Sequence, residues 1–176
     1  GTLAGLRAIK NLPRLVRAFA GLPEPWQLVI LGEGPEREAI RAAALRLDLA
    51  HRVHLPGFAA DPAKVVGLFD LFALSSDSEQ FPISVVEAMA AGLAVASPAV
   101  GDIAAMLAPA NAPFVTPPGD EAALAGALDR LAADAPLRAR IGADNRAKAR
   151  AEYEEAAMVD RYAGIYARVM RREGFP

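Results

Sequence analysis

Residues 71–96 have the sequence LFALSSDSEQFPISVVEAMAAGLAVA, and the fold class can be inferred outward from them. The first four residues are apolar, as in a short strand that is buried on both faces. A polar loop follows, and Pro82 then opens a helix that we expect to run to Ala91. Gly92 follows that helix, and residues 93–96 form a second apolar strand. This order of strand, helix and strand predicts a parallel sheet with the helix packed on one face.

The same alternation extends to both sides of this segment. Further apolar strands are expected at residues 1–6, 27–31, 52–55 and 113–115. Helices are expected from Asn11, as a cap, to Gly21, then at residues 36–47, 61–69 and 101–107, and beyond residue 115. The sequence therefore predicts an α/β fold: a Rossmann-like, doubly wound parallel sheet with helices on both faces and a helical C-terminus. Ligands of such sheets bind at the carboxyl ends of the strands, which directs attention to the loops at 7–11, 32–35, 56–61, 75–82 and 97–102.

Composition restricts the function. The 176 residues are sufficient for one globular domain, spanning 1–176, and the net charge of −2 without a basic stripe argues against nucleic acid as a partner. Cysteine is absent, and His51 and His54 lack the further ligands of a zinc site, so no metal site is expected. No run approaches the roughly 20 apolar residues of a transmembrane helix, and no signal peptide is visible, so a cytoplasmic location is expected. Because the chain opens inside an expected buried strand, we also expect a domain boundary within a longer protein.

Two glutamates flank the start of the helix at Pro82. Glu79 lies just before the first turn, where free N–H groups and the positive end of the helix dipole favour a diphosphate. Glu87 lies five residues beyond Pro82, or about 7–8 Å along the helix axis. Its neighbours Val86, Ala88 and Met89 are apolar, and a carboxylate among them needs polar partners. A pair of ribose hydroxyls would supply such partners.

With these residues in place, the sequence resembles a known family. Two glutamates separated by seven residues, with Phe81 between them and Ala88-Met89-Ala90-Ala91-Gly92 after them, resemble the signature of the family-4 (group 1) GT-B retaining glycosyltransferases. Gly32-Glu33-Gly34-Pro35 and Lys10-Asn11 follow apolar strands where that family has its glycine-rich and lysine motifs. The resemblance covers nearly the whole chain, as the C-terminal, donor-binding half of a GT-B fold.

The resemblance implies a role for each motif. Glu79 and Lys10 would be the catalytic residues, with Glu79 positioning the transferred sugar and Lys10 neutralising the departing diphosphate. Glu87 would bind the ribose hydroxyls, and the base would lie near the loop after the strand at 52–55. Further substrate contacts would come from Phe81, Pro82, Ile83, Ser84, Arg7, Gly32 and Gly34. No cofactor or metal would be needed, because the nucleotide diphosphate sugar is a substrate and the helix dipole and lysine replace a cation.

The implied reaction is the retaining transfer of a sugar, of the hexosyltransferase type. The acceptor, a glycan, lipid or small molecule, would be held by a missing N-terminal domain, so the chain alone would be inactive. In the full-length protein, peripheral contact with the inner face of the membrane would fit such acceptors. An exposed wall of the interdomain cleft would also promote self-association of the chain.

Two positions depart from the family pattern. Gly5 stands where the family commonly has an arginine, and Arg7 is the nearby substitute. Pro82 stands where a glycine is common and removes one N–H donor, which leaves the amides of Ile83 and Ser84. Both departures would weaken the grip on the diphosphate. They keep two alternatives open: a non-catalytic binding or assembly module, and a GT-B epimerase or phosphorylase.

Several residues have simpler structural explanations. Ser75, Ser76 and Ser78 are expected to be loop and capping residues, and Gly101-Asp102 to cap a helix. His51 and His54 are expected at the surface or in structural roles. The apolar stripe of the last helix is expected to be core, although in GT-B proteins this helix often crosses to the other domain. That stripe comprises Met158, Tyr162, Ile165, Tyr166, Val169 and Met170.

Overall fold

The structure, a computed structural model, describes residues 1–170, and within them the strands form two parallel three-stranded sheets. The sheets have the orders β1-β2-β3 and β4-β5-β6. They meet at Gly1, whose amino group donates to the Leu71 carbonyl oxygen at 2.7 Å and whose carbonyl oxygen accepts from Ala73 N–H at 3.0 Å. The strands are β1 (Thr2–Leu3), β2 (Leu28–Leu31), β3 (Val53–Gly57), β4 (Phe72–Ala73), β5 (Val95–Pro98) and β6 (Val115–Thr116).

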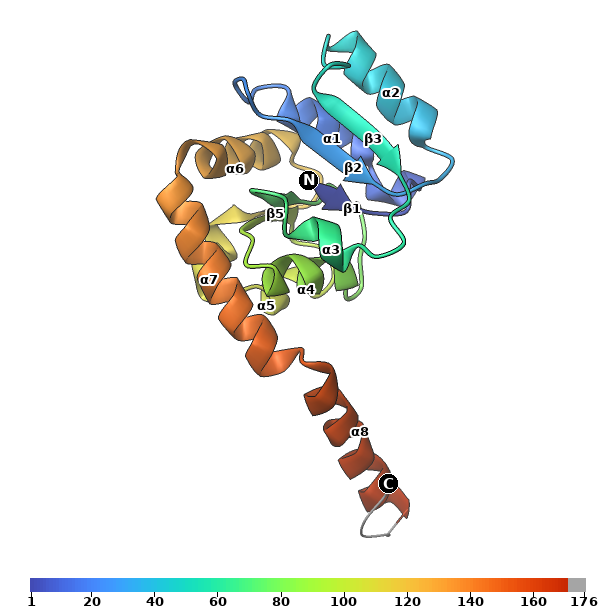
Figure 1. The fold of residues 1–176 in the computed structure, drawn as a ribbon, viewed down its shortest axis with the longest axis vertical. Helices are drawn as coiled ribbons and strands as arrows, with labels where there is room; N and C mark the ends of the chain where they lie inside the picture. The colour runs from blue at the N-terminus through green and yellow to red at the C-terminus, as the bar shows by residue number, and fades with distance from the viewer. Residues whose placement is uncertain (171–176) are drawn as a thin grey trace.

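The order across the whole fold is therefore β3-β2-β1-β4-β5-β6. The winding reverses between β1 and β4, which is the point where doubly wound sheets bind their ligands. The predicted α/β doubly wound fold is confirmed (Figure 1).

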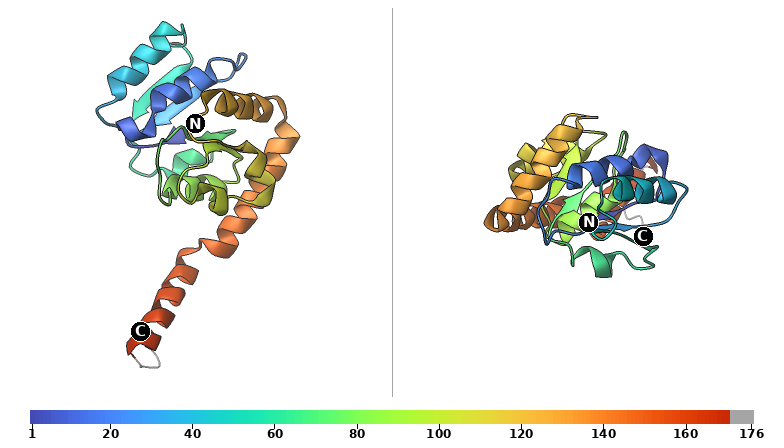
Figure 2. Two further views of the ribbon diagram at one scale, coloured as in Figure 1. Left: turned by 180° about the vertical axis from the view of Figure 1, so that it is seen from behind. Right: turned by 90° about the horizontal axis from the view of Figure 1, so that it is seen from above.

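Helices cover both faces of the sheets (Figures 1 and 2). Side chains alternate along β4, so Leu71 and Ala73 pack in one apolar cluster while Phe72 and Leu74 pack in the other. The first cluster is covered by α1 (Leu12–Phe19), α2 (Arg37–Arg46) and α6 (Glu121–Ala133). The second is covered by α3 (Ala63–Val66), α4 (Ile83–Ala90) and α5 (Ile103–Met106). Helix α7 (Ala135–Glu152) runs along the side of the β4–β6 half and contributes to both clusters.

Two fully buried asparagines connect α7 to the sheet. The Asn111 side chain accepts from Val95 N–H at 2.9 Å and donates to the Val95 carbonyl oxygen at 2.7 Å. The Asn145 amide donates to Asn111 Oδ1 and to the Leu93 carbonyl oxygen, both at 2.9 Å, and accepts from Ala108 N–H at 3.1 Å. Every polar atom of this chain of hydrogen bonds is therefore used, as burial requires. The sequence analysis did not identify either asparagine.

Several expected elements are shorter than predicted. The strand expected at 1–6 is assigned only at Thr2–Leu3, although Ala4 and Leu6 still donate to the carbonyl oxygens of Leu31 and Glu33. The helix expected at 61–69 spans only Ala63–Val66, because Gly67 is already at its C-cap. The strand expected at 113–115 is wrong in its first part, where the 3₁₀ helix η2 (Pro109–Phe114) precedes β6.

The prediction that the stripe of the last helix is core is wrong. Helix α8 (Glu155–Met170) has no buried residue, and the six apolar residues of the stripe are 45–76% exposed. Figures 1 and 2 show the physical reason: α8 continues past the end of α7 and lies beyond the body of the fold. No helix within residues 1–170 is long and apolar enough to cross a membrane.

Candidate functional site

The candidate site lies where the loops after β1 and β4 meet. Lys10 ends the 3₁₀ helix η1 (Ala8–Lys10), which follows β1 directly. Glu79 lies in the loop between β4 and α4. These two loops follow the adjacent strands at which the winding reverses, so residues 69 positions apart come into contact at the predicted edge.

Lys10 and Glu79 form a closely held ion pair. Lys10 Nζ is 2.6 Å from Glu79 Oε1 and 2.8 Å from Oε2, and the two side chains are only 15% and 8% exposed. The Ser76 hydroxyl donates to Glu79 Oε1 at 2.6 Å. Charge-assisted hydrogen bonds of this length are stronger than neutral ones, so the carboxylate is held on two sides. The structure thus brings together the two residues predicted to be catalytic.

A second set of hydrogen bonds fixes the backbone from which Lys10 projects. The buried Ser75 hydroxyl lies 3.0 Å from the carbonyl oxygens of both Lys10 and Asn11. Asp77 N–H donates to the Ile9 carbonyl oxygen at 2.9 Å, so the loop after β4 contacts three successive residues of the other loop. Ser75 therefore bridges the two loops, whereas we expected only a local loop or capping role for it. Ser76 makes its side-chain bond within its own loop, as expected of a loop residue.

Asp77 adds side-chain contacts to this bridge. Its carboxylate accepts from Arg14 Nη1 at 2.6 Å and from Asn11 Nδ2 at 3.1 Å. Asn11 is at the N-cap of α1, as predicted, but its side chain makes no capping bond because it is turned toward Asp77. Arg14 also donates to the Ser75 carbonyl oxygen at 3.1 Å. Neither Asp77 nor Arg14 was predicted from the sequence, although the strand order would have placed the loop after β4 beside the start of α1.

Glu87 lies in the middle of α4, and its carboxylate makes no hydrogen bond or ion pair with any other residue in the described part of the chain. Its side chain is half-buried, and desolvation by burial raises the pKa of its carboxyl group above the ordinary 4.5. A hydroxyl-bearing ligand would supply hydrogen bonds to the ionised carboxylate. The environment predicted from its apolar neighbours is therefore present.

The start of α4 presents the other predicted contacts. Pro82 is the N-cap, with an extended backbone, so Ile83 and Ser84 occupy the first two helical positions, where N–H groups have no intrahelical acceptor. Ile83 is 63% exposed. Phe81 is 41% exposed, and its ring packs edge-on against Tyr153 with 5.5 Å between the centroids. These amides are placed to meet an anion at the helix N-terminus.

Arg7 and the two glycines of the 32–35 turn lie beside the loop after β1. Arg7 is exposed, and its Nε is 3.5 Å from the point that a Cβ on Gly5 would occupy, so the arginine lies over Gly5. A Cβ on Gly32 would lie 1.9 Å from the Ala4 carbonyl oxygen, and one on Gly34 would lie 2.4 Å from that of Leu6. Both glycines therefore allow the backbone after β1 to approach closely.

The remaining candidates have structural explanations. Gly101 has a φ of +57°, and Asp102 is at the N-cap of α5 without a side-chain capping bond. His51 and His54 are exposed, with His51 Nε2 3.6 Å from Glu24 and His54 Nε2 2.8 Å from Gln27. Within residues 1–170 no group of three His, Cys, Asp or Glu side chains has a metal-binding arrangement.

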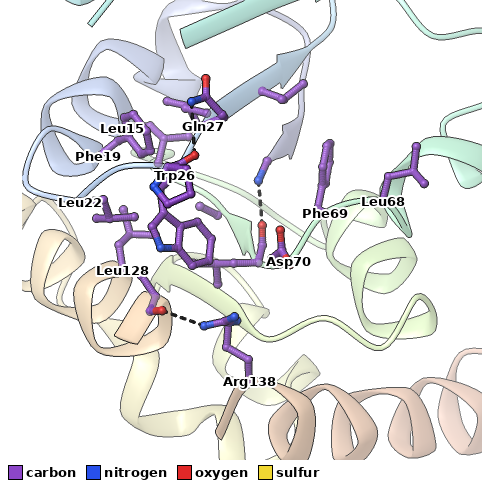
Figure 3. Close-up of a pocket in the computed structure, with 17 residues that line it drawn as sticks. Leu15, Phe19, Leu22, Trp26, Gln27, Leu68, Phe69, Asp70, Leu128 and Arg138 are labelled. Carbon is purple, nitrogen blue, oxygen red and sulfur yellow. Dashed lines mark hydrogen bonds between the residues drawn. The ribbon is translucent and has the colours of Figure 1, made fainter. Parts of the chain in front are cut away.

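A cavity of about 560 Å³ lies at the opposite edge of the sheets (Figure 3). Gly1, Gln27 and Leu71, which line it, each precede a strand, so the cavity is at the amino ends of β1, β2 and β4. The Arg138 guanidinium lies 5.1 Å from the centroid of the Trp26 ring and donates to two carbonyl oxygens at the end of α6. Because polar ligand-binding loops follow the carboxyl ends, we place the candidate site at the Lys10–Glu79 pair.

Comparison with known proteins shows the family of the chain. Residues 2–148 match the family described as glycosyl transferases group 1. The chain belongs to this family. It is 26% identical over 171 residues to N-acetyl-alpha-D-glucosaminyl L-malate synthase of Bacillus anthracis, covering 96% of this chain and 45% of that protein. It is 30% identical over 160 residues to the lipopolysaccharide core biosynthesis glycosyltransferase LpsD of Rhizobium meliloti, covering 90% of this chain and 46% of LpsD.

Solved structures confirm the GT-B type of fold for this family member. The crystal structure of Anabaena HepE in complex with UDP matches with a TM-score of 0.89 and 25% identity, over 95% of this chain and 48% of HepE. The C-terminal domain of a group 1 glycosyl transferase from Francisella tularensis matches with a TM-score of 0.76 and 21% identity, over 88% of this chain and 85% of that domain. The chain thus spans less than half the length of the two relatives and of HepE.

Proposed function

We propose that this chain is the donor-binding half of a retaining glycosyltransferase and that it binds a nucleoside diphosphate sugar between the loops after β1 and β4. The observation that carries the proposal is the meeting of Lys10 and Glu79 at the point where the winding of the sheet reverses. The family membership supports sugar transfer as the reaction, and the UDP in the HepE crystal structure makes UDP the first nucleotide to test.

The contacts suggest a role for each residue of the site. Lys10 would stabilise the charge that develops on the departing diphosphate, together with the Ile83 and Ser84 amides at the start of α4. Glu79 would position the sugar, and Glu87, which has no partner among the described residues, would accept hydrogen bonds from the ribose. Arg7, lying over Gly5, would supply the second positive charge. These groups would replace a metal ion, so we expect donor binding to persist in EDTA.

The other half of the enzyme would supply the acceptor site. The relatives are about twice as long as the matched segment, so we propose that this chain is the C-terminal domain of a two-domain protein. The acceptor would be a glycan, a lipid or a small molecule. This chain alone would then bind the donor weakly and transfer no sugar.

The experiment is a calorimetric titration of this chain with UDP, GDP, ADP and their glucose conjugates. Glu87→Ala should weaken binding of the preferred nucleotide, while Glu38→Ala, which removes an exposed carboxylate on α2, should leave it unchanged. Binding that Glu87→Ala does not change would contradict the ribose role of Glu87. An absence of binding to every nucleotide would contradict a donor site that is complete within this chain.

Gly5 and Pro82 favour one rival function, a non-catalytic module that has kept the fold and lost tight donor binding. Selective nucleotide binding that depends on Glu87 would count against that rival. A phosphorylase, the other alternative, carries lysine-bound pyridoxal phosphate, whose absorbance in the purified full-length protein would overturn the transferase proposal.

A further inference from the structure

Lys10, to which we assign the diphosphate, already has an anionic partner within the chain. An ammonium group has three N–H donors, and Lys10 Nζ lies within 2.8 Å of both oxygens of the Glu79 carboxylate. The Ser76 hydroxyl holds the same carboxylate from another side at 2.6 Å. Since the two charged side chains are 15% and 8% exposed, water screens their attraction only in part. The pair is therefore a satisfied arrangement in its own right.

A diphosphate bound by Lys10 would have to share or replace this carboxylate. Both are anionic oxygen acceptors, and both compete for the same N–H groups. We propose that Glu79 pairs with Lys10 as an internal stand-in for the phosphate, and that this competition limits the affinity of the site for nucleoside diphosphates. This inference rests on the proposed function, and it adds a property that no role in positioning the sugar requires. It makes Glu79 the residue that sets how readily the diphosphate binds and leaves.

The inference predicts a gain of affinity on mutating a residue of the site. Glu79→Gln keeps the size of the side chain and its acceptor oxygen for Ser76, but removes the charge that holds Lys10. We expect UDP and inorganic pyrophosphate each to bind this variant about 2- to 5-fold more tightly, the upper part of the range for an ion pair that water partly screens. Lys10→Met alone should bind neither ligand more tightly than the parent does. Adding Glu79→Gln to Lys10→Met should give no further gain in affinity. A catalytic residue needed only for sugar contacts would not affect pyrophosphate.

A matched control separates pairing from general charge effects. Asp102→Asn changes the net charge by the same amount, and Asp102 N–H already binds the Gln80 carbonyl oxygen, so this carboxylate belongs to the same edge. It makes no ion pair with Lys10, and we expect less than a twofold change in affinity for it. Ser76→Ala offers a second test, because it removes one support of Glu79 and should tighten binding by a smaller factor.

The titrations are run on this chain by calorimetry, with thermal melting of each variant to confirm folding. Tighter binding by Glu79→Gln than by both the parent and Asp102→Asn supports the inference. If the parent binds UDP and Glu79→Gln binds it equally or more weakly, the inference falls while the proposed function stands. If no variant binds pyrophosphate or any of UDP, GDP and ADP, both the inference and a donor site that is complete within this chain fall. If Glu79→Gln fails to fold, Ser76→Ala decides: unchanged or weaker binding overturns the inference.

Discussion

Replacing Gly101 by alanine should move the loop that carries Glu79. Gly101 has a φ of +57°, and a Cβ built on it would lie 2.4 Å from the Glu79 carbonyl oxygen and 2.5 Å from that of Gln80. A carbon atom approaches a carbonyl oxygen to about 3.3 Å at the closest common contact, so the loop would have to recede by roughly 0.9 Å. A shift of that size would take a hydrogen bond of 2.8 Å, such as that between Lys10 and Glu79 Oε2, beyond the usual limit of about 3.2 Å.

Gly119 provides a control for the strain of placing an alanine at a positive φ. Gly119 also has a positive φ, of +77°, but nothing lies within 4 Å of its built Cβ. Gly119→Ala should therefore cost only the strain of a left-handed alanine, about 1–2 kcal/mol. Gly101→Ala adds an overpacking cost of about 1–3 kcal/mol, for a total of roughly 2–5 kcal/mol. At about 2–4 °C per kcal/mol for a chain of this size, the two variants should melt several degrees apart.

Two assays check this reasoning. Urea denaturation measures the free energy of unfolding of both variants, and calorimetry measures their affinity for UDP. We expect Gly101→Ala to lose more stability than Gly119→Ala and to change the affinity for UDP, whereas Gly119→Ala leaves the affinity unchanged. Equal stability losses, with the same affinity for UDP in both variants, would refute the idea that contact with Gly101 fixes the position of Glu79.

Three further predictions test the supports of the site. Ser75→Ala and its control Ser97→Ala each remove a buried hydroxyl, and each should lower the free energy of unfolding in urea by about 1 kcal/mol. Only Ser75→Ala should weaken UDP binding, because the Ser75 hydroxyl anchors the backbone at Lys10. Asn145→Leu should cost about 2–4 kcal/mol, since it leaves the buried Ala108 N–H and Leu93 carbonyl groups unpaired; a loss below 1 kcal/mol would contradict this. Burial raises the pKa of the Glu87 carboxyl group in the folded chain. Between pH 4.5 and that raised pKa the folded state therefore binds more protons than the unfolded state, and the free energy of unfolding rises as the pH falls through this window. Glu87→Gln should therefore melt at a higher temperature than the parent at pH 7, and the difference should vanish below about pH 4.5; a variant that is less stable at pH 7 would refute the assigned cost of burial.

Local patterns were sufficient for most of the fold. The apolar runs that form β2, β4 and β5 are short and are bounded by glycine or polar residues. Their strand character therefore follows from composition alone. Helix α8 shows the limit of such patterns. Its stripe has the spacing of a buried helix face, but periodicity cannot show what lies against that face, and in this structure the stripe is exposed.

The segments that carry the site residues could be predicted from the sequence, but the contacts between those residues could not. The spacing of Glu79 and Glu87 around a helix start was visible in the sequence, and so was a lysine after the first strand. The contact between Lys10 and Glu79 depends on β1 and β4 being neighbours, which no local pattern encodes. The roles of Ser75 and Asp77 depend on the same adjacency, because their partners lie 61 to 66 residues away. Strand order is therefore the information that sequence reasoning lacked.

The polar groups of the site are of two kinds: those that already have a hydrogen-bonding partner among the described residues, and those that do not. Lys10 and Glu79 already pair with each other, so a ligand that engages either of them must share or replace a short charge-assisted bond. The Glu87 carboxylate and the amides at the start of α4 lack such partners within residues 1–170, so a ligand that engages them adds hydrogen bonds without breaking any between those residues. On the proposed function, the nucleoside would therefore supply the net attraction, while the diphosphate would have to exchange with Glu79. A nucleoside diphosphate should consequently bind much better than pyrophosphate to the parent chain, and Glu79→Gln should tighten the binding of both by a similar factor while leaving the affinity for the free nucleoside unchanged.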